Sequence, residues 1–404
     1  MSIEAAAGHI AEKLSETEFV RVYGHHDADG IASATIMCHA LHRLGKKFHL
    51  TIKNRISSDD IKNDEPTLLC DLGASLEELP DDTVVIDHHV PYFNGEYHIN
   101  PRLHNIDGEK ELSSSGLAYL VANHMGDNRD LCGLAILGMI GDKQTISGKN
   151  QEIVTEGIGN QIIVPKRGLT LAGRDTREKL YTATDPYLPG ISGNLDSVDE
   201  ILLKYSDDDD YRYEDLNSMI ILKIAEKTNE TAMQSLWGNT YELERGVIHD
   251  AHSLAAVVES CGLSNRGGLG VTLCLRNTEN VKEAWEIAIK HRLNVISEIN
   301  SAKTIEEELP VFEISKPSVS SCVADTISNN GLYNTPVFTI ARNDDNYSVS
   351  ARCPPGVEFD LSEFMKNLAE KTGGSGGGHF SRAGGIFGED GLSIFKNEVK
   401  EALT

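Results

Sequence analysis

The chain has 404 residues, of which 40% are hydrophobic and 25% charged, and its formal charge is −25 at pH 7. This length allows two or three domains with sizeable cores, and the composition is ordinary for a globular protein. The negative charge argues against a long basic groove for nucleic acid, although it permits a local positive channel or a metal-centred site.

Seven cysteines are scattered along the chain without a C-x-x-C pair. Such usage favours reduced thiols in a cytoplasm over a disulfide framework or a zinc ribbon. The N-terminal sequence MSIEAAAGHIAEKL predicts an amphipathic helix without a signal-peptide core, and no apolar run reaches about 18 residues. We therefore expect a soluble, cytoplasmic protein that does not contact a membrane.

Residues 1–195 are predicted to form an N-terminal α/β domain. Apolar runs predict strands at residues 19–23, 48–53, 67–70 and 83–86, and helical periodicity predicts helices at 31–44, 116–125 and 130–140. This alternation predicts a parallel sheet with helices on its faces. From residue 144 to 193, frequent Gly and Pro predict loops around short helices.

The rest of the chain is predicted to form a helical connector over residues 196–245 and a smaller C-terminal α/β domain over 246–404. The connector has two or three helices, with the acidic run 207–210 predicted as a solvated loop. The C-terminal domain begins with a helix that ends at Gly262 and a Gly-rich turn over 265–277. A long helix at 281–300, strands at 310–314, 337–341 and 347–352, a hairpin turn at 342–346, a helix at 361–371, a glycine loop and a short last element follow.

Four clusters of polar residues follow apolar runs in the N-terminal domain: HHDADG, CDLG, IDHH and the dipeptide GD. The carboxyl ends of parallel strands lie at one edge of a sheet, where ligands bind. A single aspartate at such a place usually caps a turn or a helix, but four clusters in order favour a common site. The candidate metal ligands are His25, Asp27, Asp29, Asp71, His88 and Asp142.

Six such ligands exceed what one ion needs and suit two ions about 3.5–4 Å apart, with a carboxylate such as Asp71 bridging them. Nitrogen and oxygen ligands without thiolate favour Mn²⁺, with Mg²⁺ as the alternative. Two ions activate a water and neutralise phosphate oxygens, as phosphoester cleavage requires. His89 is then free to contact the phosphate or to assist the leaving group, and Asp87 could orient a neighbouring imidazole.

The glycine-rich segment GGSGGGHFSRAGG near the C-terminus predicts an anion-binding loop. Glycines expose backbone N–H groups, while His379 and Arg382 supply charge and donors. A flexible linker is the alternative, but linkers rarely carry His and Arg before an apolar segment. Arg352, at the end of a predicted strand, is a candidate second phosphate contact or a solvated side chain.

With these residues in place, the chain resembles a known family. HHDADG, CDLG, IDHH and GD resemble the ordered motifs of the DHH phosphoesterase superfamily. GGGHFSRAGG resembles the signature of the C-terminal domain in its RecJ-like and nanoRNase-like branch. DPYLPGISG and HDAHSLAAVVESCG further resemble archaeal RecJ-like exonucleases, although Glu259 stands where Asn is usual.

The resemblance implies two Mn²⁺ ions in the N-terminal domain and phosphodiester hydrolysis in a cleft between the domains. It places the six candidate ligands at metal positions and His89 at a phosphate-contacting position. It also implies that the glycine loop grips the nucleic acid, through Gly376, Gly377, Gly378 and His379. Archaeal relatives are associated with the replication factor GINS and are kin to a eukaryotic helicase subunit that has lost catalysis.

We expect a Mn²⁺-dependent exonuclease that acts on single-stranded DNA or RNA in DNA repair or replication. One alternative is a phosphodiesterase of very short oligonucleotides, like nanoRNase, or of cyclic dinucleotides. Another is a replisome scaffold that binds GINS and keeps only weak nuclease activity, although every metal position is filled here. A family II pyrophosphatase fits less well, because its C-terminal signature is basic and differs from this glycine loop.

Overall fold

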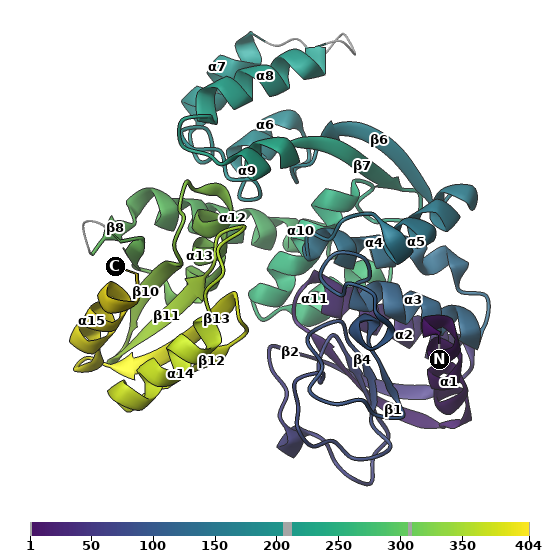
Figure 1. The fold of residues 1–404 in the computed structure, drawn as a ribbon. Coiled ribbons are helices and arrows are strands. Elements are labelled where there is room, and N and C mark those ends of the chain that lie inside the picture. The colour runs from purple at the N-terminus through teal and green to yellow at the C-terminus, as the bar shows by residue number, and fades with distance from the viewer. Residues whose placement is uncertain (1, 205–211, 306–308, 404) are drawn as a thin grey trace. The chain divides into compact units, whose positions relative to one another are not determined.

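The computed structural model describes residues 2–204, 212–305 and 309–403 and divides the chain into two compact units (Figure 1). The first unit consists of residues 1–167 and 239–288, and the second of residues 168–238 and 289–404. The domain boundary predicted near residue 246 therefore differs from the division in the structure, which places 239–288 with the N-terminal residues. The predicted α/β fold, with an N-terminal parallel sheet and a C-terminal α/β domain, is confirmed.

The first unit contains a five-stranded parallel sheet in the order β2-β1-β3-β4-β5. The chain leaves β1 toward β2 on one side and then returns to β3 on the other side. The carboxyl ends of β1 and β3 therefore lie at the point where the strand order reverses, which is where open α/β sheets bind ligands. The strands are β1 (Phe19–His25), β2 (Lys47–Lys53), β3 (Thr67–Cys70), β4 (Val84–Ile86) and β5 (His98–Ile99).

Helix α2 (Ala28–Arg43) lies at the centre of the first unit, and nearly all of its residues are buried. It packs against β1 and β2 and against helices of the same unit, so its N-terminus is held firmly. The other helices are α1 (Ile3–Glu16), α3 (Ser114–Met125), α4 (Cys132–Gly141), α5 (Gly148–Gly159), α10 (Ala251–Leu263) and α11 (Gly267–Cys274). Helix α1 confirms the helix predicted from the N-terminal sequence.

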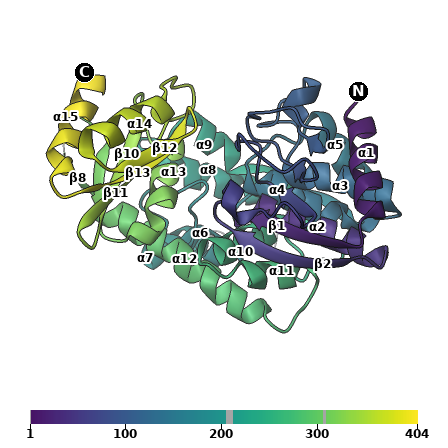
Figure 2. The ribbon, with the colours of Figure 1, turned by 90° about the horizontal axis from the view of Figure 1, so that it is seen from below.

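The second unit contains a six-stranded sheet in the order β12-β13-β11-β10-β9-β8. Figure 2 shows β10, β11 and β13 with α14 near them, and Phe338, Met365 and Phe395 pack together in the core on that face. The other face packs against α12 and α13 through residues such as Val295 and Val323. The elements are α12 (Val281–Ser301), which belongs to this unit from residue 289 onward, β8 (Lys303–Thr304), β9 (Val311–Ile314), α13 (Ser320–Asn330), β10 (Val337–Asn343), β11 (Asn346–Arg352), α14 (Leu361–Thr372), β12 (Ser375–Gly378), β13 (Arg382–Gly388) and α15 (Gly391–Leu403).

Residues 168–238 of the second unit contain the predicted connector helices and a separate small core. The predicted helices are confirmed as α7 (Leu195–Leu203), α8 (Arg212–Ile224) and α9 (Glu230–Ser235), preceded by α6 (Thr176–Tyr181). The acidic run 207–210 lies outside the described residues. Within the described ranges, no helix combines the length and the apolar character that crossing a membrane needs.

Three segments predicted as loops or turns are regular elements. The predicted Gly-rich turn is mostly helix α11. Glycine at position 267 lets this helix pack closely against β2, since a Cβ there would lie 2.5 Å from Cγ2 of Ile52. Residues Ile163–Leu169 form β6, which pairs with β7 (Trp237–Leu243) in a two-stranded ribbon that tolerates the proline within it. The glycine loop is the hairpin of β12 and β13. Helix α13 and strand β5 were not predicted.

Candidate metal centre

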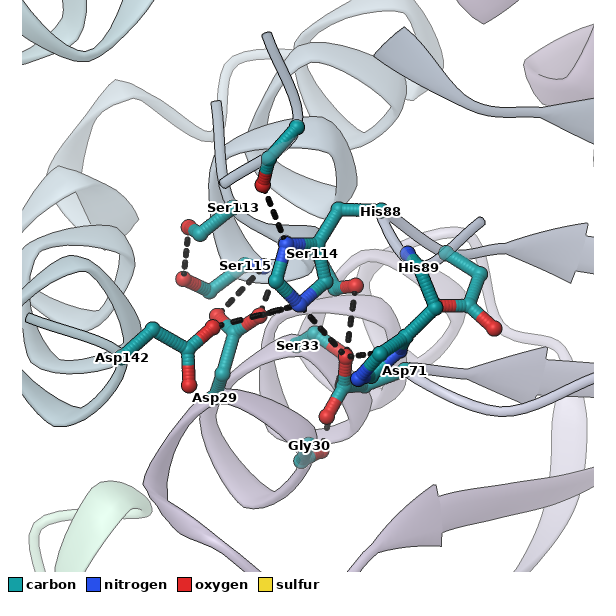
Figure 3. A network of polar contacts seen from close by, with 12 residues as sticks. Asp29, Gly30, Ser33, Asp71, His88, His89, Ser113, Ser114, Ser115 and Asp142 are labelled. Atoms are coloured by element: carbon teal, nitrogen blue, oxygen red, sulfur yellow. Dashed lines mark hydrogen bonds and ion pairs between the residues drawn. The ribbon is translucent and has the colours of Figure 1, made fainter. Parts of the chain in front are cut away.

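Three strands of the first unit end at polar residues, as the sequence predicted. Strand β1 ends at His25, while Asp71 directly follows β3 and Asp87 directly follows β4. These strands are neighbours in the sheet, so their carboxyl ends bring the three side chains to one edge. Figure 3 shows Asp71 facing His88 and His89 at this edge.

The N-terminus of α2 supplies two more carboxylates. Asp27 is the N-cap, and its Oδ1 accepts a 2.9 Å hydrogen bond from the backbone N–H of Gly30. Asp29 is fully buried and accepts hydrogen bonds of 2.8 and 2.9 Å from the backbone N–H groups of Ser114 and Ser115 at the start of α3. The free N–H groups and the dipole of a helix N-terminus favour a carboxylate there. The N-terminus of α2 therefore presents Asp29, and N–H groups at the N-terminus of α3 hold its carboxylate in place.

Asp71 occupies the centre of the site in a strained backbone conformation. Its φ of 60° lies in the left-handed region, which costs free energy for a residue that is not glycine. Its Oδ2 lies 3.2 Å from Nδ1 of His25, and its Oδ1 accepts a 2.9 Å hydrogen bond from the hydroxyl of Ser114. Such strain is typical of functional positions that the surrounding structure holds in place.

His88 connects the remaining carboxylates. Its Nε2 lies 3.4 Å from Oδ1 of Asp71, 3.2 Å from Oδ2 of Asp142 and 4.0 Å from Oδ2 of Asp29. Its Nδ1 lies 2.6 Å from the carbonyl oxygen of Gly108, to which it can donate a hydrogen bond. A histidine held in this way at Nδ1 keeps Nε2 for a metal ion, because a carbonyl partner fixes the tautomer.

The structure therefore brings all six predicted ligands into one cluster. Their ligand atoms form three overlapping groups, in each of which the atoms lie within 4.8 Å of one another. Asp71 belongs to two of the groups and so does His88, and His89 joins one of them. The groups are His25, Asp27 and Asp71; Asp71, His88 and His89; and Asp29, His88 and Asp142.

Two features of the cluster fit a metal ion. Oδ2 of Asp142 is buried, yet it accepts no hydrogen bond from the residues that the structure describes. Nε2 of His88 lies 3.2 Å from it, and a metal ion bound between the two side chains would neutralise this buried oxygen. Gly138, one turn before Asp142, leaves space for Asp29, since a Cβ there would lie 1.8 Å from Oδ1 of Asp29.

The carboxylates and imidazoles also shift one another's pKa. Burial and the neighbouring Asp71 raise the pKa of Asp29 to about 6, and burial together with Asp29 raises the pKa of Asp142 well above its usual value. Burial acts to lower the pKa of His25 and of His88, but the surrounding carboxylates outweigh it and raise both. Without metal, these carboxylates and imidazoles therefore tend to bind protons at the positions where a cation would bind.

His89 and Asp87 form a pair beside the cluster. Oδ1 of Asp87 lies 2.7 Å from Nδ1 of His89 and accepts a 3.1 Å hydrogen bond from its backbone N–H. Oδ2 of Asp87 accepts a 2.9 Å hydrogen bond from the backbone N–H of Ala74, so the carboxylate is fixed from both sides. Burial acts to lower the pKa of His89, but Asp87 outweighs it and raises that pKa. The orienting role of Asp87 stays a prediction, and this contact is the one through which it would act.

The predicted substrate residues of the C-terminal domain lie on neighbouring strands of the second unit. Gly376, Gly377 and Gly378 belong to β12, and His379 begins the turn that leads to Arg382 at the start of β13. Arg352 pairs with Arg382 in the sheet, and both donate to Oδ1 of Asp325, at 2.7 and 2.8 Å. The Arg352 side chain is only 12% exposed, whereas that of Arg382 is 61% exposed. Their contacts with substrate stay a prediction.

Packing also explains part of the glycine pattern in this hairpin. A Cβ at Gly376 would lie 2.5 Å from the carbonyl oxygen of Met365, and one at Gly374 would lie 2.2 Å from that of Ile386. These glycines let β12 lie directly against α14 and β13. A Cβ at Gly377, in contrast, would meet no atom within 4 Å. Of these three positions, only Gly377 lacks a steric reason for glycine.

Sequence reasoning missed the residues that support the ligands from α3 and α4. Ser114 and Ser115 contact Asp71 and Asp29, and Gly138 gives Asp29 its space. The run of serines before an apolar helix was a capping signal, and Ser113 is indeed the N-cap of α3. That signal locates the start of the helix, but it cannot show which carboxylate the helix faces.

Two family models match the chain. The first describes the DHH family, N-terminal domain, and matches residues 19–139, while the second describes the DHHA1 domain and matches residues 311–404. An uncharacterized protein of Methanocaldococcus jannaschii is 27% identical and aligns with 99% of this chain and 97% of its own length. The single-stranded-DNA-specific exonuclease RecJ of Bacillus subtilis is 26% identical over 188 residues, which are 39% of this chain and 23% of that protein.

Solved structures share the fold at low sequence identity. RecJ of Thermus thermophilus in complex with Mn²⁺ matches with a TM-score of 0.61 and 18% identity, covering 99% of this chain and 54% of that one. CDC45 of Entamoeba histolytica matches with a TM-score of 0.68 and 12% identity, covering 99% and 98%. The chain thus spans about half of the Thermus RecJ, and these likenesses concern the fold.

Proposed function

The chain belongs to the DHH superfamily and is RecJ-like, and from this premise we propose that it is a Mn²⁺-dependent exonuclease that shortens single-stranded DNA or RNA. The observation that carries the proposal is the sharing of Asp71 and His88 among the three groups at the strand ends. Shared ligands suit two neighbouring ions, and two-metal sites serve phosphodiester hydrolysis. The RecJ of Bacillus subtilis is a single-stranded-DNA-specific exonuclease by name, and the RecJ of Thermus thermophilus forms a complex with Mn²⁺, which supports this choice.

Each part of the cluster has a role in this proposal. His25, Asp27 and Asp71 would hold one ion, and Asp29, His88 and Asp142 the other, with Asp71 next to both. When bound, the ions would lower the pKa of a water molecule and neutralise the charge that builds up on phosphate oxygens. The protein contributes the fixed positions of its ligands, because the hydroxyl of Ser114 donates to Asp71 and the carbonyl of Gly108 accepts from His88.

His89 is the proposed proton donor or phosphate contact. Asp87 holds a proton at Nδ1 of His89, which leaves Nε2 as the position where a second proton can bind. The raised pKa of His89 favours the protonated ring, so it can donate to a phosphate oxygen or to the leaving oxygen. Arg382 and His379, on the hairpin of the second unit, are the proposed contacts to the phosphates of the nucleic acid.

Two other functions keep support from particular observations. A phosphodiesterase of dinucleotides or short oligomers would use the same ligands, and the charge of −25 favours a short substrate over a long polyanion. A scaffold that binds GINS or another replication factor would need an exposed contact surface. The side chains of Leu203 on α7 and Leu222 on α8 are 87% and 81% exposed and are the apolar groups that such a partner would cover.

Hydrolysis of end-labelled single strands tests the proposal. Purified protein with Mn²⁺ is given DNA and RNA from two to about 40 nucleotides, beside the Asp71→Ala variant and the Asp81→Ala variant, whose exposed carboxylate lies outside the ligand groups. Stepwise shortening that Asp71→Ala abolishes and Asp81→Ala keeps would support the exonuclease. Cleavage of dinucleotides and short oligomers alone would favour the short-substrate phosphodiesterase. No cleavage at any length would contradict both and leave the scaffold.

A further inference from the structure

Helix α10 touches the backbone of the HHDADG motif. Gly262, near the end of this helix, packs against His26 so closely that a Cβ there would lie 1.5 Å from the carbonyl oxygen of His26. This glycine has no positive φ, so the reason for it is space rather than backbone conformation. The contact joins α10 to the HHDADG motif, which carries the candidate ligands His25, Asp27 and Asp29.

Glu259 lies one turn before Gly262 on the same face of α10, since residues three apart in a helix are neighbours on its surface. Its Oε2 accepts a 2.6 Å hydrogen bond from the backbone N–H of Ala28. Ala28 is the first residue of α2 and lies between the ligands Asp27 and Asp29. One side chain from a distant part of the sequence thus reaches the peptide between two ligands.

The N–H of Ala28 needs such an acceptor. The first four N–H groups of a helix have no partner within the helix, and the N-cap Asp27 accepts from Gly30 instead. Ala28 is fully buried, so bulk water does not replace the missing acceptor. A buried N–H without a partner is energetically costly, and the local backbone would shift to find one.

We infer that Glu259 is a positioning residue for the metal centre. By accepting from the N–H of Ala28, it fixes the peptide between Asp27 and Asp29 and so the angle between their carboxylates. Asp27 and Asp29 belong to different ligand groups, so this peptide sets how the two groups face each other. Glu259 belongs to none of the groups and acts on the ion through the backbone. The inference rests on the proposed metal site but not on the proposed substrate.

Variants at position 259 that separate the length of the side chain from its charge test this role. Glu259→Gln keeps an acceptor of the same length and loses the charge, whereas Glu259→Asp keeps the charge and is one methylene too short. Glu259→Met keeps the packing of the stem without an acceptor. Glu283→Gln is the matched control, because Glu283 is an exposed partner of Arg266 and belongs to no ligand group. Mn²⁺ affinity is measured by titration calorimetry without any substrate.

We expect Glu259→Gln and Glu283→Gln to bind Mn²⁺ within about threefold of the unchanged protein, whereas Glu259→Asp and Glu259→Met lose about 10–100-fold. Circular dichroism of the metal-free variants identifies any that fail to fold. Among the folded variants, the difference in Mn²⁺ affinity between Glu259→Gln and Glu259→Asp decides whether Glu259 positions the ligands. Unchanged affinity in Glu259→Asp, or a loss in Glu259→Gln as large as in Glu259→Asp, would overturn the inference. If the protein binds Mn²⁺ as inferred but cleaves no nucleic acid, only the proposed function fails.

Discussion

The hydroxyl of Ser114 donates a 2.9 Å hydrogen bond to Oδ1 of Asp71, and this bond joins the start of α3 to the carboxylate at the centre of the ligand cluster. The backbone N–H of the same serine donates to Oδ2 of Asp29. One residue therefore holds a member of each of two ligand groups, and the spacing between those groups depends on where α3 begins.

Ser114→Ala removes the bond to Asp71 and keeps the backbone bond to Asp29. We expect Mn²⁺ affinity or hydrolysis to fall about 10–100-fold, because residues that orient a ligand have effects of this size. Ser260→Ala is the matched control, since its hydroxyl is also buried but donates to the carbonyl of Ala256 in α10 and contacts no candidate ligand. Equal metal affinities for the two variants, measured by calorimetry, would show that the bond to Asp71 does not orient the ligand.

Gly138→Ala would place a methyl group against Asp29. The Cβ would lie 1.8 Å from Oδ1 of Asp29 and 2.2 Å from Oγ of Ser115, so the carboxylate has to move. We expect loss of metal binding and a free energy of unfolding lower by about 1–3 kcal/mol. In the same helix, a Cβ at Gly133 meets its nearest atom at 3.6 Å, and Gly133→Ala should keep metal binding and stabilise the helix. Thermal melting and calorimetry check both variants.

The metal-free protein should lose stability with rising pH through the range in which Asp29 ionises. Burial and Asp71 raise the pKa of Asp29 to about 6, above its ordinary value of 3.8, so the folded state binds this proton more tightly than the unfolded chain. The contribution of Asp29 to stability is therefore present below pH 4 and lost as the pH rises through 6. The raised pKa values of His25 and His88 act in the same direction at higher pH.

Mn²⁺ binding at the proposed site should reverse this trend, because the ligands must lose their protons before they coordinate. We expect the increase in melting temperature caused by a fixed concentration of Mn²⁺ to be larger at pH 7 than at pH 5. Calorimetry in two buffers of different ionisation enthalpy should detect proton release at pH 6. An increase in melting temperature that does not vary with pH would contradict the assignment of these groups as ligands.

Arg382 and Arg352 should behave differently although they share Asp325. Arg382 is largely exposed, so Arg382→Ala should weaken binding of a single strand and reduce the salt dependence of log K by about one unit without changing the melting temperature. Arg352 is mostly buried and also donates to the carbonyl of Ala351, so Arg352→Ala should lower the melting temperature. Arg342→Ala, an exposed arginine near Glu389, is the control. Fluorescence anisotropy at several salt concentrations measures the binding.

The sequence predicted that His25, Asp71 and His88 lie together because each stands at the end of an apolar strand or just after it. Asp71 and Asp87 come directly after β3 and β4, and parallel strands that are neighbours place such residues at one edge. The order of the strands was not needed, since any neighbouring arrangement would bring these ends together. The contacts of Ser114 and Glu259 could not be predicted, because they depend on how α3 and α10 pack against α2.

Glycine explains two of the three segments that were predicted wrongly as loops or turns. Gly267 and Gly376 indicated a turn and a loop, but in the structure they allow a helix and a strand to pack closely against Ile52 and Met365. A sequence shows that glycine is present and not which of its two properties, backbone freedom or small size, the fold uses. The partner that approaches the glycine belongs to another element, so local patterns cannot identify it.

Phe380 should distinguish a substrate that carries bases from one that does not. It lies in the turn between β12 and β13, its side chain is 54% exposed, and its carbonyl accepts a 2.8 Å hydrogen bond from Leu361 N–H that fixes the turn. An exposed aromatic ring beside Arg382 can stack on a base, which is worth about 1–3 kcal/mol.

We expect Phe380→Ala to raise KM for single strands about 5–150-fold and to leave hydrolysis of bis(p-nitrophenyl) phosphate unchanged, whereas Phe380→Trp keeps both. Ile386→Ala, which removes another exposed apolar side chain of this hairpin, should change neither activity. Equal losses of activity on both substrates would show that Phe380 stabilises the hairpin and does not recognise a base.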